Sequence, residues 1–187
     1  MNNEVTLVGR VSSGMDPDHE DFFRFTVDVT RESGTIDRIP VVVPERLIEA
    51  EYYGNTVGIR GRYRSYNQHE AGKTTLLLYV DATEVKVLDQ SQNVNDVFLE
   101  GFVCKKPAIR RTPSGRDITD VILSVPRENG KSDYIPCITW GAAAKFVDGL
   151  EPGSRLRVAG RLQSRDYVKN EVTRTAYELS VELVEVI

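Results

Sequence analysis

Apolar and polar residues alternate along most of this chain with the period of two that is typical of half-buried β-strands. In the second half of the chain, turn-rich stretches separate the alternating runs, and one helix is predicted where GAAAKFVDGL precedes Glu-Pro-Gly at 141–150. The predicted strands are 96–104, 117–125, 134–140, 154–167 and 174–187. The order is therefore three strands, one helix and two strands.

The first half of the chain repeats this order. RESGTIDRIP at 31–40 returns as RENGKSDYIP at 127–136, an offset of 96 residues. Two further matches have offsets of 92 and 99: NEVTLVGRV at 3–11 with NDVFLEGFV at 95–103, and GIRGRYRS at 58–65 with RVAGRLQS at 157–164. Because the offset changes only slowly, the chain is interpreted as a tandem duplication of a module of about 90 residues. The expected modules are 1–90 and 94–187, joined by the polar stretch DQSQNVN.

Three strands, a helix and two strands is the order of the OB fold, a five-stranded barrel whose face and loops bind oligonucleotides or oligosaccharides. The sequence thus predicts an all-β protein of two tandem OB-fold barrels, with one short helix in each module. In the first module the helix is expected at 44–53, with Pro44 in its first turn. Four glycines fall inside strand patterns and are expected where the barrel requires close approach or sharp bending: Gly9, Gly61, Gly101 and Gly160.

The repeated decapeptide is interpreted as a structural hairpin between strands two and three. Three recurring pairs are expected to shape its turn and its exit into strand three: Arg31 and Arg127, Gly34 and Gly130, and Pro40 and Pro136. They recur in a first module that lacks the aromatic residues of the second. This favours a role in folding over a role in ligand binding.

Charge is distributed unevenly between the two halves. The net charge is −4, but residues 1–92 hold 10 Lys and Arg against 15 Asp and Glu, whereas residues 93–187 hold 14 against 13. The second half is therefore the better candidate for an anionic ligand. No apolar run is long enough to cross a bilayer and no signal peptide is recognised, so a cytoplasmic protein is expected. The two cysteines, Cys104 and Cys137, are expected to be small buried hydrophobes.

The sequence does not display a catalytic or metal-binding pattern. Its two histidines, His19 and His69, lie in loop-like segments of the first module without a nucleophile motif. The acidic stretch DPDHED at 16–21 lacks the spacing of a calcium loop and is interpreted as a solvated turn. No enzymatic activity, metal or cofactor is therefore expected.

Basic residues interleaved with aromatic ones form the strongest candidate site. The aromatic candidates are Tyr134, Trp140 and Tyr167, and the basic candidates of the first long loop are Lys105, Lys106, Arg110, Arg111 and Arg116. Strand four adds a row of arginines expected on one face: Arg155, Arg157, Arg161 and Arg165. Cations that follow phosphates and flat rings that stack on unpaired bases are the means by which single strands are bound. The alternative for any one of these residues is a solvated arginine or a core aromatic.

The second half resembles the bacterial single-stranded DNA-binding proteins. The loop KKPAIRRTPSG matches that family's loop at Pro107, Arg110, Thr112, Pro113 and Gly115. YIPCITWGAAAKFV and GSRLRVAGRLQSRDY are similar to the segments that follow it. The resemblance covers nearly all of 95–187 and extends more weakly to 3–88. It implies that Tyr134, Trp140 and Tyr167 stack on bases and that Arg110 is the loop arginine.

The first module departs from the family pattern. Its first loop is acidic, Arg38 replaces Tyr134, and the position of Trp140 falls near Pro44. It keeps arginines and tyrosines on strand four, of which Arg62, Arg64 and Tyr66 are candidate contacts. The first module is therefore expected to bind weakly or to serve mainly in assembly.

The leading hypothesis is sequence-independent binding of single-stranded DNA, without catalysis, in replication, recombination or repair. The resemblance implies four OB modules in the working assembly, so a homodimer is expected, with a monomer as the alternative. The chain ends in VELVEVI without the family's acidic recruitment tail, so recruitment by that route is not expected. The alternative function is a primosomal-type module that assembles proteins and binds nucleic acid secondarily. RNA binding also stays open.

Overall fold

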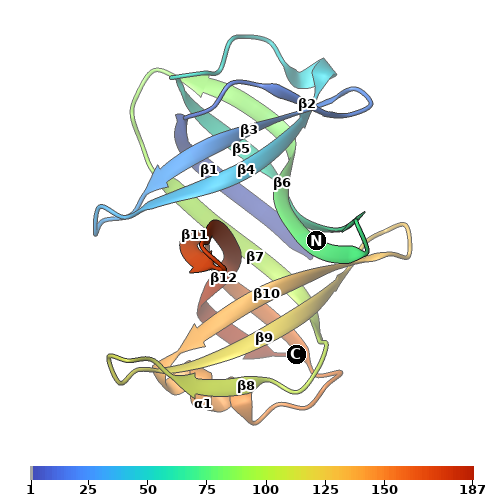
Figure 1. Ribbon diagram of the computed structural model, residues 1–187, viewed down its shortest axis with the longest axis vertical. Coiled ribbons are helices and arrows are strands. Elements are labelled where there is room, and N and C mark those ends of the chain that lie inside the picture. Colours follow the sequence, from blue (N-terminus) through green and yellow to red (C-terminus); the bar gives the residue numbers. More distant parts are fainter. Residues whose placement is uncertain (1) are drawn as a thin grey trace.

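The computed structural model describes residues 2–187 and consists largely of β-strands, arranged in two barrels along its long axis (Figure 1). The strands of the first half are β1 (Asn3–Val11), β2 (Asp16–His19), β3 (Phe22–Thr30), β4 (Ile36–Pro44), β5 (Thr56–Glu70) and β6 (Lys73–Leu88). The second half contains β7 (Val94–Val103), β8 (Ala108–Arg111), β9 (Asp117–Pro126), β10 (Ser132–Trp140), α1 (Gly141–Asp148), β11 (Arg155–Lys169) and β12 (Val172–Val186). No helix among the described residues is both long and apolar enough to cross a membrane.

Each half closes into a ring of five strands. In the first half the order is β1–β5–β6–β4–β3, and β3 pairs back onto β1. The second half has the same ring, β7–β11–β12–β10–β9, closed by β9 on β7. Only the β4–β6 and β10–β12 pairs are parallel, and the other pairs are antiparallel. The predicted all-β class with two tandem OB-fold barrels is therefore confirmed.

The helix predicted at 44–53 in the first half is wrong. The structure has only a 3₁₀ turn there, Glu45–Leu47, which ends in extended backbone at Ile48. Tyr52 explains the difference, because its ring is buried against Phe25 with the centroids 5.7 Å apart. Its hydroxyl donates to the carbonyl of Leu47 at 3.0 Å. In the second half α1 fills this part of the barrel with Ala144 and Val147, so one tyrosine replaces a helix face.

Two segments interpreted as loops contain short strands. In the second half, β8 pairs with β9 inside the basic loop, and in the first half β2 pairs with β3 inside the acidic stretch. Neither strand belongs to the ring of five. β2 and β8 are the terminal strands of the sheet, and each forms a hairpin with the ring strand that follows it. The expectation for the cysteines is half right, since Cys137 is buried but Cys104 is exposed just after β7.

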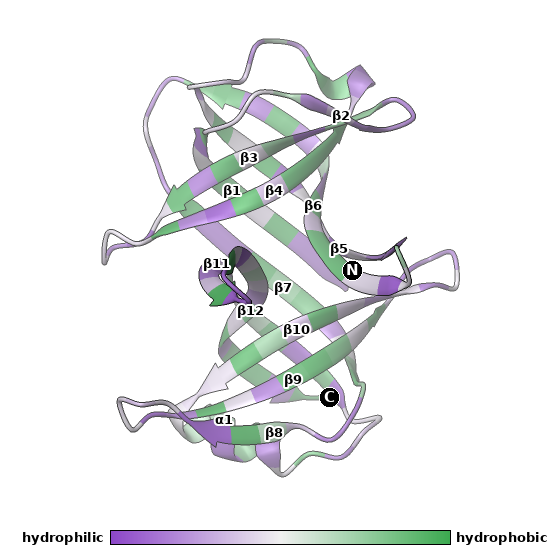
Figure 2. Cartoon of the chain, in the orientation of Figure 1, coloured by the Kyte–Doolittle hydropathy of each residue, from purple (hydrophilic) through white to green (hydrophobic). Residues whose placement is uncertain are grey.

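Alternation along the strands fills both barrels with apolar side chains (Figure 2). Residues at equivalent positions of the repeat form the two hydrophobic cores. Four such pairs, each residue at most 2% exposed, are Leu7 and Leu99, Ile39 and Ile135, Val57 and Leu156, and Tyr63 and Leu162. Burial of an aliphatic or aromatic side chain stabilises a fold by about 1.5–3 kcal/mol. The repeated sequence therefore encodes one core twice.

Close strand approach explains the strand glycines, as the sequence predicts. A Cβ atom at Gly61 or Gly160 would collide with the carbonyl oxygen of Asp81 or Ser180 on the neighbouring strand. Both glycines lie at a register shift, where β5 and β11 bend against their partners. Any larger residue here would push the hairpin strands apart.

The two halves join through an antiparallel pair between β1 and β7. Val5 lies opposite Val97, its own equivalent in the repeat, and Asn3 opposite Leu99 mirrors Leu7 opposite Asn95. Such a register is self-complementary, which is the property of a two-fold interface. The halves are thus related by an approximate two-fold axis near Val5 and Val97.

A buried aspartate from each repeated decapeptide spans this junction. Asp37 is fully buried and accepts hydrogen bonds from Arg31 of its own hairpin at 2.6 and 2.7 Å. The same carboxylate accepts the backbone N–H of Ser164 in the second half at 3.1 Å. The Ser164 hydroxyl in turn accepts the backbone N–H of Arg38 at 2.8 Å.

The equivalent residues repeat this arrangement on the other side of the axis. Asp133 is fully buried, pairs with Arg127, and accepts the backbone N–H of Ser65 at 2.8 Å. The Ser65 hydroxyl accepts the N–H of Tyr134 at 2.8 Å. Arg64 adds a second guanidinium to Asp133 at 2.9 Å. These two Arg–Asp–Ser sets, called the junction clamps here, give the recurring arginines a role beyond the turn.

Native thiol reactivity tests the burial of the two cysteines. Burial raises the pKa of the Cys137 thiol well above its usual range, so its thiolate is scarce and shielded. The native protein is expected to react at one thiol with a disulfide reagent and the unfolded protein at two. A Cys104→Ser variant should lose the fast reaction. Fast labelling of this variant would contradict the buried position.

Removal of a clamp carboxylate tests the junction. Asp133→Ala is expected to lower the free energy of unfolding by about 3–5 kcal/mol, because it leaves the Arg127 charge partly buried without its partner. Asp120→Ala is the matched control, since its pair with Arg110 is exposed and is expected to contribute about 0–1 kcal/mol. Urea unfolding measures both. Equal effects of the two variants would show that the clamp does not hold the halves together.

Candidate nucleic-acid interface

The outer face of β10 presents two aromatic side chains. Tyr134, near the start of the strand, has 41% of its surface exposed, and Trp140 ends the strand half-buried. They are six positions apart, an even number, so both project from the same face. The Trp140 indole N–H donates to the Ser180 hydroxyl at 3.3 Å, which fixes the plane of the ring.

Arg116 lies over the Trp140 ring, with its guanidinium carbon 4.6 Å from the centroid. The β8–β9 hairpin places it there: the N–H of Thr112 donates to the carbonyl of Arg116, and Gly115 adopts φ +83° in the turn. Ile118, two residues after Arg116 on β9, lies opposite Trp140 of β10 in the antiparallel pair. A guanidinium over an indole face is a cation–π pair, which leaves its charge accessible to an anion.

Two arginines of β11 lie on the same side of the barrel. Arg161 approaches Glu182 at 3.7 Å, and its buried Nε has no hydrogen-bond partner among residues 2–187. Arg165 pairs with Glu178 at 3.1 Å and lies 5.9 Å from the ring centroid of Tyr167.

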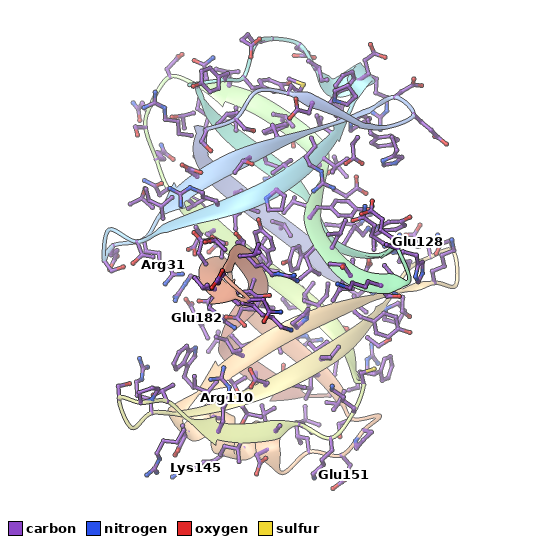
Figure 3. The ribbon with its side chains drawn as sticks, viewed as in Figure 1. Arg31, Arg110, Glu128, Lys145, Glu151 and Glu182 are labelled. Carbon is purple, nitrogen blue, oxygen red and sulfur yellow. The ribbon has the colours of Figure 1, made fainter. Side chains whose placement is uncertain are left out.

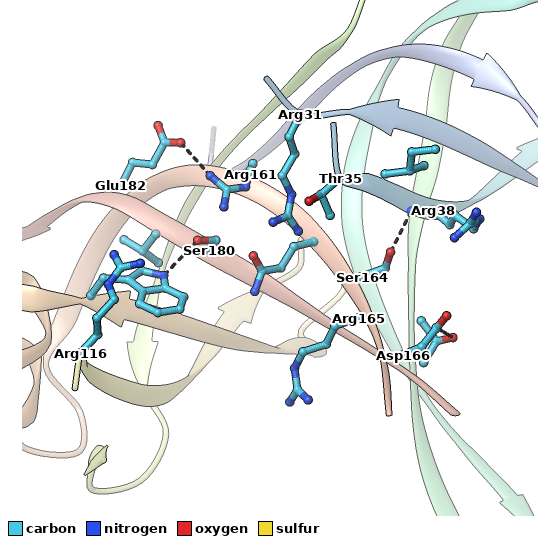
Figure 4. Close-up of a pocket in the computed structure, with 15 residues that line it drawn as sticks. Arg31, Thr35, Arg38, Arg116, Arg161, Ser164, Arg165, Asp166, Ser180 and Glu182 are labelled. Atoms are coloured by element: carbon cyan, nitrogen blue, oxygen red, sulfur yellow. Dashed lines mark hydrogen bonds and ion pairs between the residues drawn. The ribbon is translucent and has the colours of Figure 1, made fainter. Parts of the chain in front are cut away.

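These side chains meet the first half in a groove of about 660 Å³ at the junction (Figure 4). It is called the Arg38 groove here. From the first half it is lined by Arg31, Thr35, Ile36 and Arg38, and from the second by Arg116, Trp140, Arg161, Gln163, Ser164, Arg165, Asp166, Thr175, Ser180, Val181 and Glu182. The structure thus brings together Arg116, Trp140, Arg161 and Arg165, all four of them predicted site residues.

Among the arginines that line the groove, Arg31 and Arg38 are the two that were not predicted as site residues. Figure 3 shows Arg31 and Glu182 close to the junction of the two barrels. The repeat does carry a signal for Arg38, because it occupies the place of Tyr134 on strand three. That substitution looked like the loss of a stacking residue, and only the packing of the halves shows that it adds a cation.

The other predicted basic residues of the second half lie outside this groove. Arg110 pairs with Asp120 at 2.7 Å and Arg111 with Asp117 at 3.2 Å along the β8–β9 edge. Lys105 is exposed, and Lys106 contacts Glu151 at 2.8 Å in the loop after α1. They form a basic outer edge that is largely paired with acids.

Only part of the predicted row of arginines on β11 reaches the Arg38 groove. Arg155 and Arg157 both pair with Glu100 of β7, at 3.2 and 2.9 Å, at the opposite end of the strand from Arg165. Hydrogen bonds from Arg157 hold the pKa of Glu100 below its usual range. The row is therefore divided into a paired group at one end and the Arg38 groove at the other.

The first-half candidates lie on the other side of the junction. Arg62 and Arg64 line a second groove of about 680 Å³, called the Arg62 groove here, which also contains Asp81, Glu100, Arg127 and Arg155. Arg64 is held by Asp133, and burial raises the pKa of Asp81 despite the nearby Arg64. Tyr66 is 59% exposed and follows Ser65, whose hydroxyl accepts the Tyr134 N–H. Tyr66 is thus near the Tyr134 end of β10.

No three His, Cys, Asp or Glu side chains between residues 2 and 187 are grouped so that they could hold a metal ion.

Comparison with protein families finds a match to the second half of the chain. The model of the single-strand binding protein family matches residues 94–187. Single-stranded DNA-binding protein 2 of Streptomyces coelicolor is 36% identical over 96 residues, covering 45% of this chain and 48% of that protein. Single-stranded DNA-binding protein A of Bacillus subtilis is 35% identical over 100 residues, covering 49% and 58%. The chain spans about half the length of these curated relatives.

A solved structure matches the whole fold. The wild-type single-stranded DNA binding protein from Thermus aquaticus aligns with a TM-score of 0.81 at 21% identity, over 99% of this chain and 92% of that chain. The likeness extends through both halves, although the family match covers only the second. The first half therefore keeps the fold while its sequence has diverged.

Tryptophan emission tests the geometry of the groove, since Trp140 is the single tryptophan of the chain. Arg116→Ala is expected to shift the native emission to longer wavelength, because water replaces the guanidinium over the ring. Arg111→Ala is the control from the same hairpin and should leave the emission unchanged. Identical spectra for wild type and Arg116→Ala would contradict the stacked arrangement.

Proposed function

Because the chain belongs to the single-strand binding protein family, we propose that it binds single-stranded DNA without sequence preference and without catalysis. The substrates are the single strands exposed in replication, recombination and repair. One observation carries the proposal: the face of an OB barrel gathers Trp140, Arg116, Arg161 and Arg165 in an open groove. OB folds that bind single strands combine such cations with flat rings.

The aromatic residues act as stacking platforms. Trp140 and Tyr134 project from one face of β10, and Tyr167 extends from β11 beside Arg165. Each stacked base contributes about 1–3 kcal/mol with little preference among bases, because every base has a π-face. Tyr66 of the first half adjoins the Tyr134 end of the path through Ser65.

The arginines hold phosphates. Arg116 and Arg165 lie beside the rings of Trp140 and Tyr167, and Arg161 lines the same groove as Trp140. Arg110, Arg111, Lys105 and Lys106 extend this surface as the basic edge. Arg110 and Arg161 pair with solvent-accessible acids, and such surface pairs are worth only about 0–1 kcal/mol. A phosphate can therefore replace the Asp120 or Glu182 carboxylate at small cost. Arg64 is assigned to the junction, because Asp133 already engages it.

The two OB folds, taken as modules 1–90 and 94–187, are proposed to work as a homodimer with four OB folds in total. Within the chain, the β1–β7 pair already joins two of these four OB folds about an approximate two-fold axis. The mass in solution, measured by light scattering with and without DNA, distinguishes the dimer from a monomer.

Titration with a fluorescent thymidine oligomer tests the function. About 30 nucleotides suffice for two OB folds at up to about 16 each. Affinity is expected to fall about a hundredfold between 50 and 200 mM salt if roughly five phosphates are neutralised. Trp140→Ala should weaken binding about tenfold or more through the lost stacking.

Arg161→Ala should lower the slope of log affinity against log salt by about 0.7, which corresponds to one phosphate. Arg157→Ala is the matched control, since this arginine of the same strand pairs with Glu100 away from the groove. No binding by wild type at low salt would refute the proposed function. It would favour the alternative, in which the two barrels mainly assemble other proteins.

A further inference from the structure

The approximate two-fold axis produces two related grooves at the junction of the halves, and their residues have diverged. The repeat offsets make Arg161 the equivalent of Arg62 and Ser180 the equivalent of Asp81. Each groove combines a hairpin strand of one half with the decapeptide hairpin of the other. A perfectly repeated chain would offer a ligand two identical crossings between its barrels.

The Arg62 groove has most of its positive charge matched by acids of the chain. Asp81 stands where the other groove has Ser180, and Arg64 is placed between Asp81 at 3.8 Å and Asp133 at 2.9 Å. Arg155 at its rim pairs with Glu100 at 3.2 Å. Three of its four arginines, Arg64, Arg127 and Arg155, therefore pair with carboxylates of the chain itself. Arg62 forms no ion pair within residues 2–187, but it lies near the Asp81 carboxylate, which has no counterpart at Ser180.

The Arg38 groove keeps free positive charge. Arg38 and Arg116 form no ion pair within residues 2–187, and both side chains are exposed. Ser164 accepts the backbone N–H of Arg38, so the clamp fixes this backbone and leaves the guanidinium available (Figure 4). The unpartnered Nε of Arg161 lies in the same groove.

We propose that a single strand leaving Trp140 crosses from the second half to the first through the Arg38 groove and not through the Arg62 groove. Bases stack on Tyr134 and Trp140 along β10, and the sugar–phosphate backbone then reaches Arg38 at the start of β4. The first half, with Arg38 in the place of a stacking tyrosine, contributes to binding by holding phosphate. This inference rests on the proposed function and adds a route and a named first-half contact to it.

Three matched variants test the crossing: Arg38→Ala, its counterpart Arg62→Ala in the other groove, and Arg38→Tyr, which restores the residue of the second half. Each is titrated with thymidine oligomers of about 8 and about 30 nucleotides, since one OB fold occupies about 4–16. Thermal unfolding of each variant checks that the substitution leaves the fold intact.

Arg38→Ala is expected to weaken binding of the long oligomer about three- to tenfold and to reduce its salt slope by about 0.7–1. Binding of the short oligomer, which the second half accommodates alone, should not change. Arg62→Ala should alter neither. Arg38→Tyr should regain affinity for the long oligomer while keeping the lowered salt slope, because stacking then replaces a phosphate contact.

Two results would overturn the crossing while leaving the proposed function intact. In one, Arg38→Ala binds the long oligomer like wild type although Trp140→Ala is impaired. In the other, Arg62→Ala loses as much as Arg38→Ala, so that both grooves are used. Failure of wild type to bind either oligomer would instead remove the proposed function itself.

Discussion

The relative position of the two barrels depends on two carboxylates that have no access to water. A buried carboxylate is tolerated only when cations and N–H donors surround it. Asp37 and Asp133 each obtain the cation from their own hairpin and an N–H from the opposite half. Any rotation of one barrel against the other would take a donor from a buried charge. The clamps therefore fix the orientation of the halves, and with it the shape of both junction grooves.

Local pattern was sufficient for most of the fold. Alternation predicted the strands, and the slowly changing offset of the repeat predicted that the second barrel copies the first. The exception is the segment after Pro44, whose composition suits a helix. There Tyr52 inserts into the barrel beside Phe25 and supplies the burial that a helix face provides in the other half. A contact between residues so far apart in the chain does not appear in the periodicity of either segment.

The sequence likewise predicted only part of the candidate site. Trp140, Arg116 and Arg161 could be predicted together, because they belong to neighbouring strands and one hairpin of a single barrel. The role of Arg38 could not, because it depends on a hydrogen bond between residues 126 positions apart in the chain. Nor could the pairing of Arg155 and Arg157 with Glu100, which requires the β7–β11 register. Charge spacing along a strand shows which residues share a face, but not which acids face them from the next strand.

The short connection between β6 and β7, residues 89–93, has a consequence for evolution as well as for stability. When identical subunits associate, every substitution appears on both sides of the axis, so the two grooves must change together. Here the partners are parts of one polypeptide, and their association does not depend on protein concentration. Each half is encoded separately and can vary alone. The linker therefore allows the chain to break its own symmetry: one groove retains Arg38 and Arg116 unpaired, and the other pairs three of its four arginines with acids.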